Sequence, residues 1–373
     1  MPSYNNHEQY FDILSEPKNL TSIKSDLIRY DNFIDPQFKV AFGGTEWNRK
    51  NVSDMIASNK GTYIHHIDDD FTTSSFDVEG VVHGLQAEIV WAIVVCPVEE
   101  KITVVFRGSV ALHDWVSNIQ LNMMDYKLPG FTSKANEKEG IGKTFGRVHE
   151  GFYKYLFHET KAGKNGSTKS KGEEIMGMLM GDFFSKPEFK KYSLEITGHS
   201  LGGSLSTMFA FRAAAFNDLP NTMVTNVSFA SPFVGDSDFR KAFCDLERKR
   251  KIRHLRISNY QDVVPLIPAM TFPVPDGVQM FKHVGMNIRL YDGNDFLAPS
   301  YRRFYPKVGS FVNGIRNSMH NDILTGLSVG VIGKHLCPEY DKRLTNEKTA
   351  KELKKLTLDE LYASKDITGW DYL

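Results

Sequence analysis

The stretch TGHSLGGSLS, residues 197–206, is the most informative part of the chain. It follows a short strand-like run and precedes a longer apolar run of helical length. A serine on a sharp strand-to-helix turn needs neighbours without side chains two positions away, and Gly198 and Gly202 meet that need. We therefore predict a nucleophile elbow made of Gly198, His199 and Gly202 around Ser200, with the Leu201 N–H as one oxyanion donor. The alternative is a Gly-Ser turn without chemistry, which the flanking strand and helix patterns disfavour.

The runs on either side of the elbow predict the fold class. Apolar, β-branched segments bounded by turn residues are typical of strands in a covered sheet, and segments of helical length separate them. Such alternation favours an α/β fold with a mostly parallel central sheet and helices on both faces. The expected strands are residues 87–96, 101–109, 193–198, 226–232 and 254–259, and the expected helices are residues 172–184, 201–216 and 236–250.

Composition limits the possible partners and surroundings. The 373 residues carry 45 Lys plus Arg against 45 Asp plus Glu, so no overall field would draw the chain to nucleic acid. The longest apolar run, residues 87–98, is shorter than the ~20 residues that a membrane span needs, so we expect no transmembrane segment. Three widely spaced cysteines suit a reducing compartment, and the N-terminus shows no secretion signal, so we expect an intracellular location.

A serine hydroxyl becomes nucleophilic when a histidine accepts its proton and a carboxylate orients that histidine. Asp262, on a turn just past a strand-like run, is the candidate acid; a plain turn before a proline-rich loop is the alternative. The candidate bases downstream are His254, His283, His320 and His335. His254 lies in a basic run and is expected to be structural or on the surface. Residue chemistry alone does not choose among the other three.

Five segments together resemble the class 3 lipases, the fungal-lipase-like α/β-hydrolases, and occur in that family's order. The resemblance covers residues 80–344. The segments are VVFRGSVALHDW (104–115), VHEGFYKYL (148–156), TGHSLGGSLS (197–206), SFASPFVGD (228–236) and NYQDVVPLIP (259–268).

The resemblance implies roles for particular residues. Ser109 would supply a second oxyanion contact, through its N–H and hydroxyl. Ser200 would be the nucleophile, Asp262 the acid and His335 the base, with His320 as the alternative base and His283 as a noncatalytic residue. The chain departs from the family pattern at Asn118, Ala230 and Asn287, and none of these is a triad member.

In this family the segment after Ser109 forms a lid over the active site. Residues 110–126 mix apolar and polar side chains at helical spacing, which suits a short amphipathic helix that could meet a lipid surface. A fixed helix that faces the core is the alternative. The lid candidates are Leu112, Trp115, Val116 and Ile119.

From these patterns we expect a serine hydrolase that cleaves carboxylic esters of lipids through an acyl-enzyme, resembling triacylglycerol lipases. The alternatives are a phospholipase A1, a soluble esterase of the feruloyl type, or a catalytically silent scaffold on the same fold. The expected partners are an acyl-ester substrate and transiently a lipid interface. No cofactor and no metal are expected, because His65, His66 and residues 68–70 lack the spacing of a metal site.

Length and motif order predict three parts of the chain. Residues 1–79 would be a helical lead-in packed on the main domain, residues 80–344 the catalytic domain, and residues 345–373 a C-terminal amphipathic helix or tail. Residues 128–146 and 161–172, rich in Gly, Lys, Ser and Thr, are expected to be loop insertions.

Overall fold

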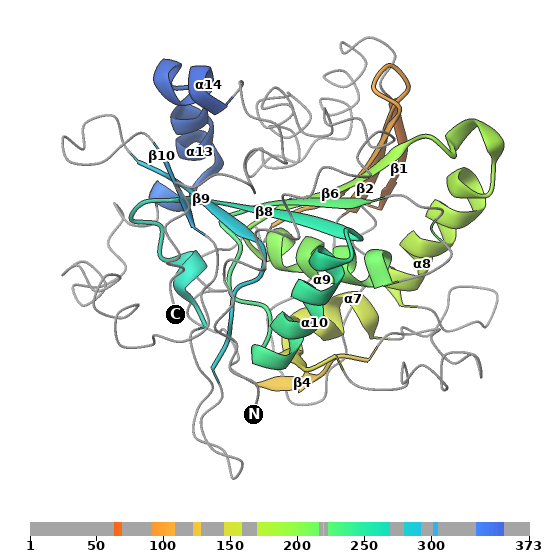
Figure 1. The fold of residues 1–373 in the computed structure, drawn as a ribbon, viewed down its shortest axis with the longest axis horizontal. Helices are drawn as coiled ribbons and strands as arrows, with labels where there is room; N and C mark the ends of the chain where they lie inside the picture. Colours follow the sequence, from red (N-terminus) through yellow and green to blue (C-terminus); the bar gives the residue numbers. More distant parts are fainter. Residues whose placement is uncertain are drawn as a thin grey trace.

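A computed structural model gives the fold (Figure 1). It describes residues 63–68, 91–108, 122–127, 145–158, 170–215, 219, 223–268, 280–291, 301–304 and 333–353. The statements below concern these residues.

An eight-stranded sheet forms the centre, in the order β1-β2-β3-β6-β7-β8-β9-β10. The pairs from β3 through β6, β7 and β8 to β9 are parallel, whereas β1, β2 and β10 extend the edges in antiparallel pairings. The expected mostly parallel sheet is therefore confirmed. Its strands are β1 (Tyr63–Asp68), β2 (Trp91–Cys96), β3 (Lys101–Phe106), β6 (Ser193–His199), β7 (Val224–Phe229), β8 (Ile252–Asn259), β9 (Met286–Leu290) and β10 (Tyr301–Phe304).

Helices and helical turns follow the strands as the sequence pattern predicts. Helices α7, α8, α9 and α10 gather below the sheet in Figure 1, and their side chains share one apolar core with alternate residues of β2, β3 and β6. The helical elements are α7 (Glu150–Phe157), α8 (Lys171–Met178), the π-helix η2 (Leu179–Phe184), η3 (Pro187–Phe189), α9 (Leu201–Ala215), α10 (Ser237–Arg248), η4 (Val264–Leu266), α13 (Cys337–Leu344) and α14 (Glu347–Leu353).

The central strands and α9 are enclosed on all sides, so their polar side chains are buried together with the apolar ones. Every residue of β2, β3, β7 and β8 is buried, as expected for strands that are covered on both faces. In α9 every residue except Ala215 is buried, so this helix lies inside the domain rather than on its surface. The element that follows Ser200 is therefore rigidly enclosed, and the turn at Ser200 is fixed from both ends.

Two predicted segments differ in part from expectation. Residues 63–68, within the predicted helical lead-in, form β1 at the edge of the main sheet. The predicted amphipathic helix covers residues 110–126, but near its end residues Met123–Asp125 form strand β4. This strand pairs with β5 (Arg147–His149). Tyr126 next to it is fully buried, and its hydroxyl donates to the Met208 carbonyl at 2.9 Å. Backbone pairing and this aromatic anchor override the helical spacing of the sequence.

Candidate active site

Ser200 lies on the tight turn between β6 and α9. Its φ of 58° is in the left-handed region, which costs an L-residue about 1–2 kcal/mol. Two close approaches require the flanking glycines: a Cβ at Gly198 would lie 2.2 Å from the Gly202 carbonyl oxygen, and a Cβ at Gly202 would lie 2.3 Å from the Phe106 carbonyl oxygen. The turn thus has the strained strand-turn-helix geometry of a nucleophile elbow.

The chain leaving β3 passes directly beside this turn. A Cβ at Gly108 would lie 2.7 Å from the His199 carbonyl oxygen and 3.3 Å from Ser200 Cβ. Ser109 follows Gly108 but lies outside the described residues, so its oxyanion role stays a prediction. Leu201 is the first residue of α9, at the helix end where N–H groups and the helix dipole favour negative charge. Its role as a donor also stays a prediction.

Asp262 lies just beyond the carboxyl end of β8 and is buried. Its carboxylate accepts a hydrogen bond from the Tyr340 hydroxyl at 2.7 Å and one from the Val264 N–H at 3.0 Å. Burial raises the pKa of Asp262, but the His335 charge and the hydrogen bonds from His335, Tyr340 and Val264 outweigh it, so the pKa lies below its ordinary value. The carboxylate is therefore ionised at neutral pH.

His335 meets this carboxylate from a segment 73 residues further along the chain. Its Nδ1 lies 3.1 Å from Oδ1 and 3.0 Å from Oδ2 of Asp262. An ionised carboxylate only accepts hydrogen bonds, so Nδ1 carries a proton, and in the tautomer protonated at Nδ1 alone Nε2 is an acceptor. A histidine in this tautomer can accept a proton through Nε2 while its partner stabilises the resulting charge.

The residue before Ser200 connects the elbow to the base. The His199 ring packs on the His335 ring with centroids 4.7 Å apart, and its Nε2 lies 2.9 Å from the His335 carbonyl oxygen. Ser200 Oγ and His335 Nε2 are both buried, and neither has a hydrogen-bond partner within the described part of the chain. A hydroxyl and a ring nitrogen with unused hydrogen-bonding capacity are thus both buried on either side of His199.

Part of this chain matches a known protein family. Residues 103–272 match the profile of the family described as Lipase (class 3). This segment belongs to the class 3 lipase family. The lipase segment contains the elbow and Asp262, and His335 lies beyond its end.

Individual relatives of the lipase segment carry enzyme names. Phospholipase A1-IIgamma from Arabidopsis thaliana is 30% identical over 178 residues, which are 46% of this chain and 39% of that protein. The chloroplastic galactolipase DONGLE from the same plant is 26% identical over 205 residues, which are 51% of this chain and 40% of that protein. The chain therefore spans less than half the length of these relatives.

A solved structure supports the fold of the lipase segment and its surroundings. The crystal structure of a mutant form of MDLA from Penicillium cyclopium superposes with a TM-score of 0.50 at 17% identity. The match covers 82% of this chain and 93% of that chain. At this identity the likeness concerns the fold, and it agrees with the expected α/β-hydrolase architecture.

The other candidate histidines have different surroundings from His335. His283 stacks on Phe233 with ring centroids 3.7 Å apart, and its Nε2 donates to the Pro265 carbonyl at 2.7 Å. His254 is buried in β8, with its Nε2 3.0 Å from Ser228 Oγ. Burial lowers the pKa of both rings well below the ordinary value. These contacts fit structural roles. His320 lies outside the described residues.

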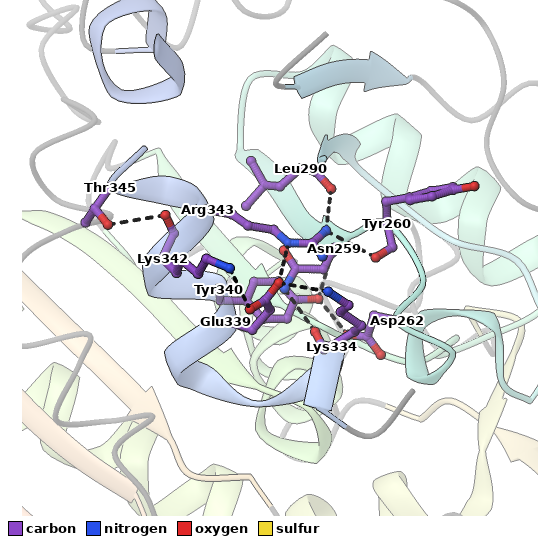
Figure 2. Close-up of polar contacts among 10 residues, drawn as sticks. All are labelled: Asn259, Tyr260, Asp262, Leu290, Lys334, Glu339, Tyr340, Lys342, Arg343 and Thr345. Carbon is purple, nitrogen blue, oxygen red and sulfur yellow. Dashed lines mark hydrogen bonds and ion pairs between the residues drawn. The ribbon is translucent and has the colours of Figure 1, made fainter. Parts of the chain in front are cut away.

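Sequence reasoning missed the part that α13 plays in the candidate site (Figure 2). The Tyr340 hydroxyl donates to Asp262 and accepts the Asn259 N–H at 2.9 Å. The Asn259 side chain donates from Nδ2 to the Lys334 carbonyl at 2.9 Å. Nothing in the sequence indicated that the Tyr340 hydroxyl reaches Asp262. Asn259 carried no signal.

Three further predictions concern the lid, a metal site and a membrane span. The lid candidates Leu112, Trp115, Val116 and Ile119 lie outside the described residues. No group of three or more His, Cys, Asp or Glu side chains that could hold a metal ion occurs among the residues that the structure describes. None of the helices in the described ranges has the length and apolar character needed to cross a membrane.

Proposed function

We propose that this chain is a serine hydrolase that cleaves carboxylic esters of lipids. The observation that carries the proposal is the buried hydrogen bond between His335 Nδ1 and the Asp262 carboxylate, next to a strained elbow that presents Ser200. Buried ionic groups are costly to retain unless they are well paired. An acid–base pair that leaves Nε2 open beside a strained serine is the arrangement that acyl transfer requires.

In the proposed mechanism His335 Nε2 accepts the proton of Ser200 as Oγ attacks the ester carbonyl. The Leu201 N–H and the Ser109 N–H and hydroxyl donate to the oxyanion of the tetrahedral intermediate. The protonated ring then gives its proton to the departing alcohol, and an acyl-Ser200 ester remains. Water attacks this ester while His335 accepts a proton from it. The ring then gives that proton to Ser200 Oγ as the bond between Oγ and the acyl carbon breaks, and the fatty acid leaves. Asp262 keeps the ring oriented and stabilises its positive charge throughout.

The central experiment is the loss of activity in Ser200→Ala. We expect this variant to lose hydrolysis of p-nitrophenyl acyl esters, because no other group on the turn can form the acyl-enzyme. Ser185→Ala is the matched control, since its hydroxyl only donates to the Gly181 carbonyl on an exposed helix end. Full activity in Ser200→Ala would contradict the assignment.

A fluorophosphonate probe separates a hydrolase from a silent scaffold. We expect covalent labelling at Ser200 in the wild-type chain and in Ser185→Ala, and much slower labelling in Asp262→Asn, where the base is no longer oriented. A wild-type chain that folds but takes no label at Ser200 would favour the scaffold.

Glycerolipids with polar head groups are the first substrates to test, because the relatives named above are a phospholipase A1 and a galactolipase. Triacylglycerols are the second candidate and soluble feruloyl-type esters the third. A set of these esters with matched acyl chains should be assayed below and above the concentration at which each aggregates. A rate that rises at aggregation supports action at a lipid interface, whereas simple saturation on monomers supports a soluble esterase.

We also propose an intracellular location and transient contact with a lipid surface through the lid candidates. The location is supported by Cys96, Cys244 and Cys337, which are all free thiols. Burial raises the pKa of Cys244 to about 11 and that of Cys337 to about 12, so both stay in the unreactive protonated form.

The division into residues 1–79, 80–344 and 345–373 remains a proposal, with β1 assigned to the main sheet.

A further inference from the structure

Charged side chains around α13 form a bridge between the segment that carries His335 and the loop that carries Asp262 (Figure 2). Lys334 Nζ donates to Glu339 Oε1 at 3.3 Å, and Arg343 Nε donates to the same oxygen at 3.0 Å. Lys334 directly precedes His335. The Glu339 carboxylate therefore links the neighbour of the proposed base to Arg343.

Arg343 continues the bridge to the loop that carries Asp262, which we call the acid loop. Its side chain is buried, and its Nη1 donates to the carbonyl oxygens of Tyr260 and Leu290, both at 3.1 Å. Leu290 is the last residue of β9, and its carbonyl also accepts the Tyr260 N–H at 2.8 Å. The guanidinium thus ties the end of β9 to Tyr260, which directly follows β8 and lies two residues before Asp262.

The acid loop needs such support because its backbone is not regular. Gln261, between Tyr260 and Asp262, has a φ of 69°, in the left-handed region. Strained residues persist only where their surroundings fix them. A guanidinium spreads its donors over three nitrogens in a rigid planar fork, so it reaches a carboxylate and two carbonyls that lie in different directions, whereas an ammonium carries its three donors on a single nitrogen.

We propose that Arg343, acting with Glu339, is a positioning residue that sets the Asp262 carboxylate relative to the His335 ring. This inference rests on the proposed function. Asp262 comes from a loop and His335 from a short helical segment before α13, and a base must be held within about 0.5 Å of its productive position. The bridge connects these two segments through α13 and does not contact Ser200.

The test compares Arg343→Met and Arg343→Lys with the control Arg248→Met. Arg248 forms its ion pair with Asp245 on the exposed side of α10, so the control removes the same side chain and a similar charge away from the site. The kcat of each variant should be expressed per site titrated with a fluorophosphonate, which removes the effect of unfolded protein. We expect Arg343→Met to lower kcat by about 10-fold with KM nearly unchanged, because a misplaced base slows chemistry rather than binding.

The lysine variant separates positioning from simple charge. Lysine can still pair with Glu339 but cannot also hold both carbonyls, so we expect Arg343→Lys to recover stability more than kcat. If Arg343→Met does not fold, Glu339→Gln is the second variant and should give a smaller fall in kcat in the same direction. Wild-type kcat per titrated site in Arg343→Met, or in Glu339→Gln where the methionine variant does not fold, would overturn the inference.

A readout without turnover distinguishes this inference from the proposed function. The proton between His335 Nδ1 and Asp262 should give a far-downfield proton NMR signal, which Arg343→Met broadens through exchange with water and Arg248→Met preserves. If the wild type hydrolyses no ester and the signal is lost in Arg343→Met but not in Arg248→Met, the link between Arg343 and the His335–Asp262 pair is supported and the proposed function is rejected. Hydrolysis by the wild type with an unchanged signal and unchanged kcat in Arg343→Met would reject the inference alone.

Discussion

The His199 side chain donates a hydrogen bond from Nε2 to the carbonyl oxygen of His335, at 2.9 Å. Burial and the neighbouring His335 ring lower the pKa of His199 to about 3. The ring is therefore neutral at any pH where an ester hydrolase is assayed, and since a carbonyl only accepts, its Nε2 carries the proton. The residue before the proposed nucleophile thus holds the backbone of the proposed base.

Replacement of His199 should slow chemistry in a way that depends on the donor. His199→Phe keeps an aromatic ring but leaves the His335 carbonyl without this donor, which costs about 1–3 kcal/mol for a buried group. We expect kcat to fall by about 10-fold with KM nearly unchanged. His199→Gln restores an N–H at a similar distance from the backbone and should retain more of the activity. Equal kcat values for the two variants would contradict a role for the hydrogen bond.

Tyr340→Phe should lower both stability and activity. The lost hydroxyl leaves the buried Asn259 N–H without its acceptor and leaves Asp262 Oδ2 with the His335 contact alone, at a cost of about 1–3 kcal/mol in the free energy of unfolding. The pKa of Asp262 should rise, because one of the hydrogen bonds that lower it is gone. Urea unfolding measures the first effect. Tyr153→Phe is the control, since its hydroxyl donates to the Lys127 carbonyl at the surface and should change stability by less than about 0.5 kcal/mol.

Stability should decline as the pH falls below about 6.5, the ordinary pKa of histidine. Burial lowers the pKa of His199, His254 and His283 in the folded chain, so over this range protons bind to these histidines only after unfolding. Each contributes a slope of up to about 1.4 kcal/mol per pH unit, with full stability above pH 6.5. The pKa of Asp262 is lowered instead, so its contribution is lost only when the pH falls through that lower value.

His254→Gln tests this origin of the pH dependence. Glutamine can keep a hydrogen bond to Ser228 and does not titrate, so its free energy of unfolding should change less between pH 8 and pH 5 than that of the wild type. Parallel curves for the two proteins would show that His254 does not contribute.

Gly198→Ala should be strongly destabilising, because its Cβ would lie 2.2 Å from the Gly202 carbonyl oxygen and neither backbone segment can move away. We expect a loss of more than about 3 kcal/mol or no folded protein. Gly177→Ala is the matched control on α8. No atom lies within 4 Å of its added Cβ, and alanine should raise helix stability by up to about 1 kcal/mol. Thermal unfolding of the two variants should therefore shift in opposite directions.

Local patterns predicted the parts of the fold that depend on neighbours in sequence. The strands β2, β3, β7 and β8 were predicted from short runs rich in apolar and β-branched residues, and both faces of these strands are covered. Helices α9 and α10 lie close to their predicted bounds. β4 was missed because its pairing with β5 bridges residues 123 and 149, which no local period reveals.

In the candidate site, too, the residues that depend on near neighbours in sequence were predictable and those that depend on long-range contacts were not. Ser200 was recognisable because the glycines that its turn requires lie two residues on either side. The choice of His335 needed a family resemblance, since four downstream histidines have the same chemistry and differ only in their tertiary surroundings. The contacts of Tyr340 and Arg343 join residues 78 and 83 positions apart. They depend on where α13 docks, which short-range patterns cannot supply.

The order of the groups along the chain makes α13 the last described element needed to complete the site. During synthesis the ribosome releases the parallel strands β3, β6, β7 and β8, with the serine turn and Asp262, before residues 333–344 have emerged. A nascent chain at that stage holds the proposed nucleophile and the proposed acid but has neither His335 nor the side chains that brace it. The proposed ester cleavage would therefore begin only when α13 docks, which delays the chemistry until the strand framework is already made.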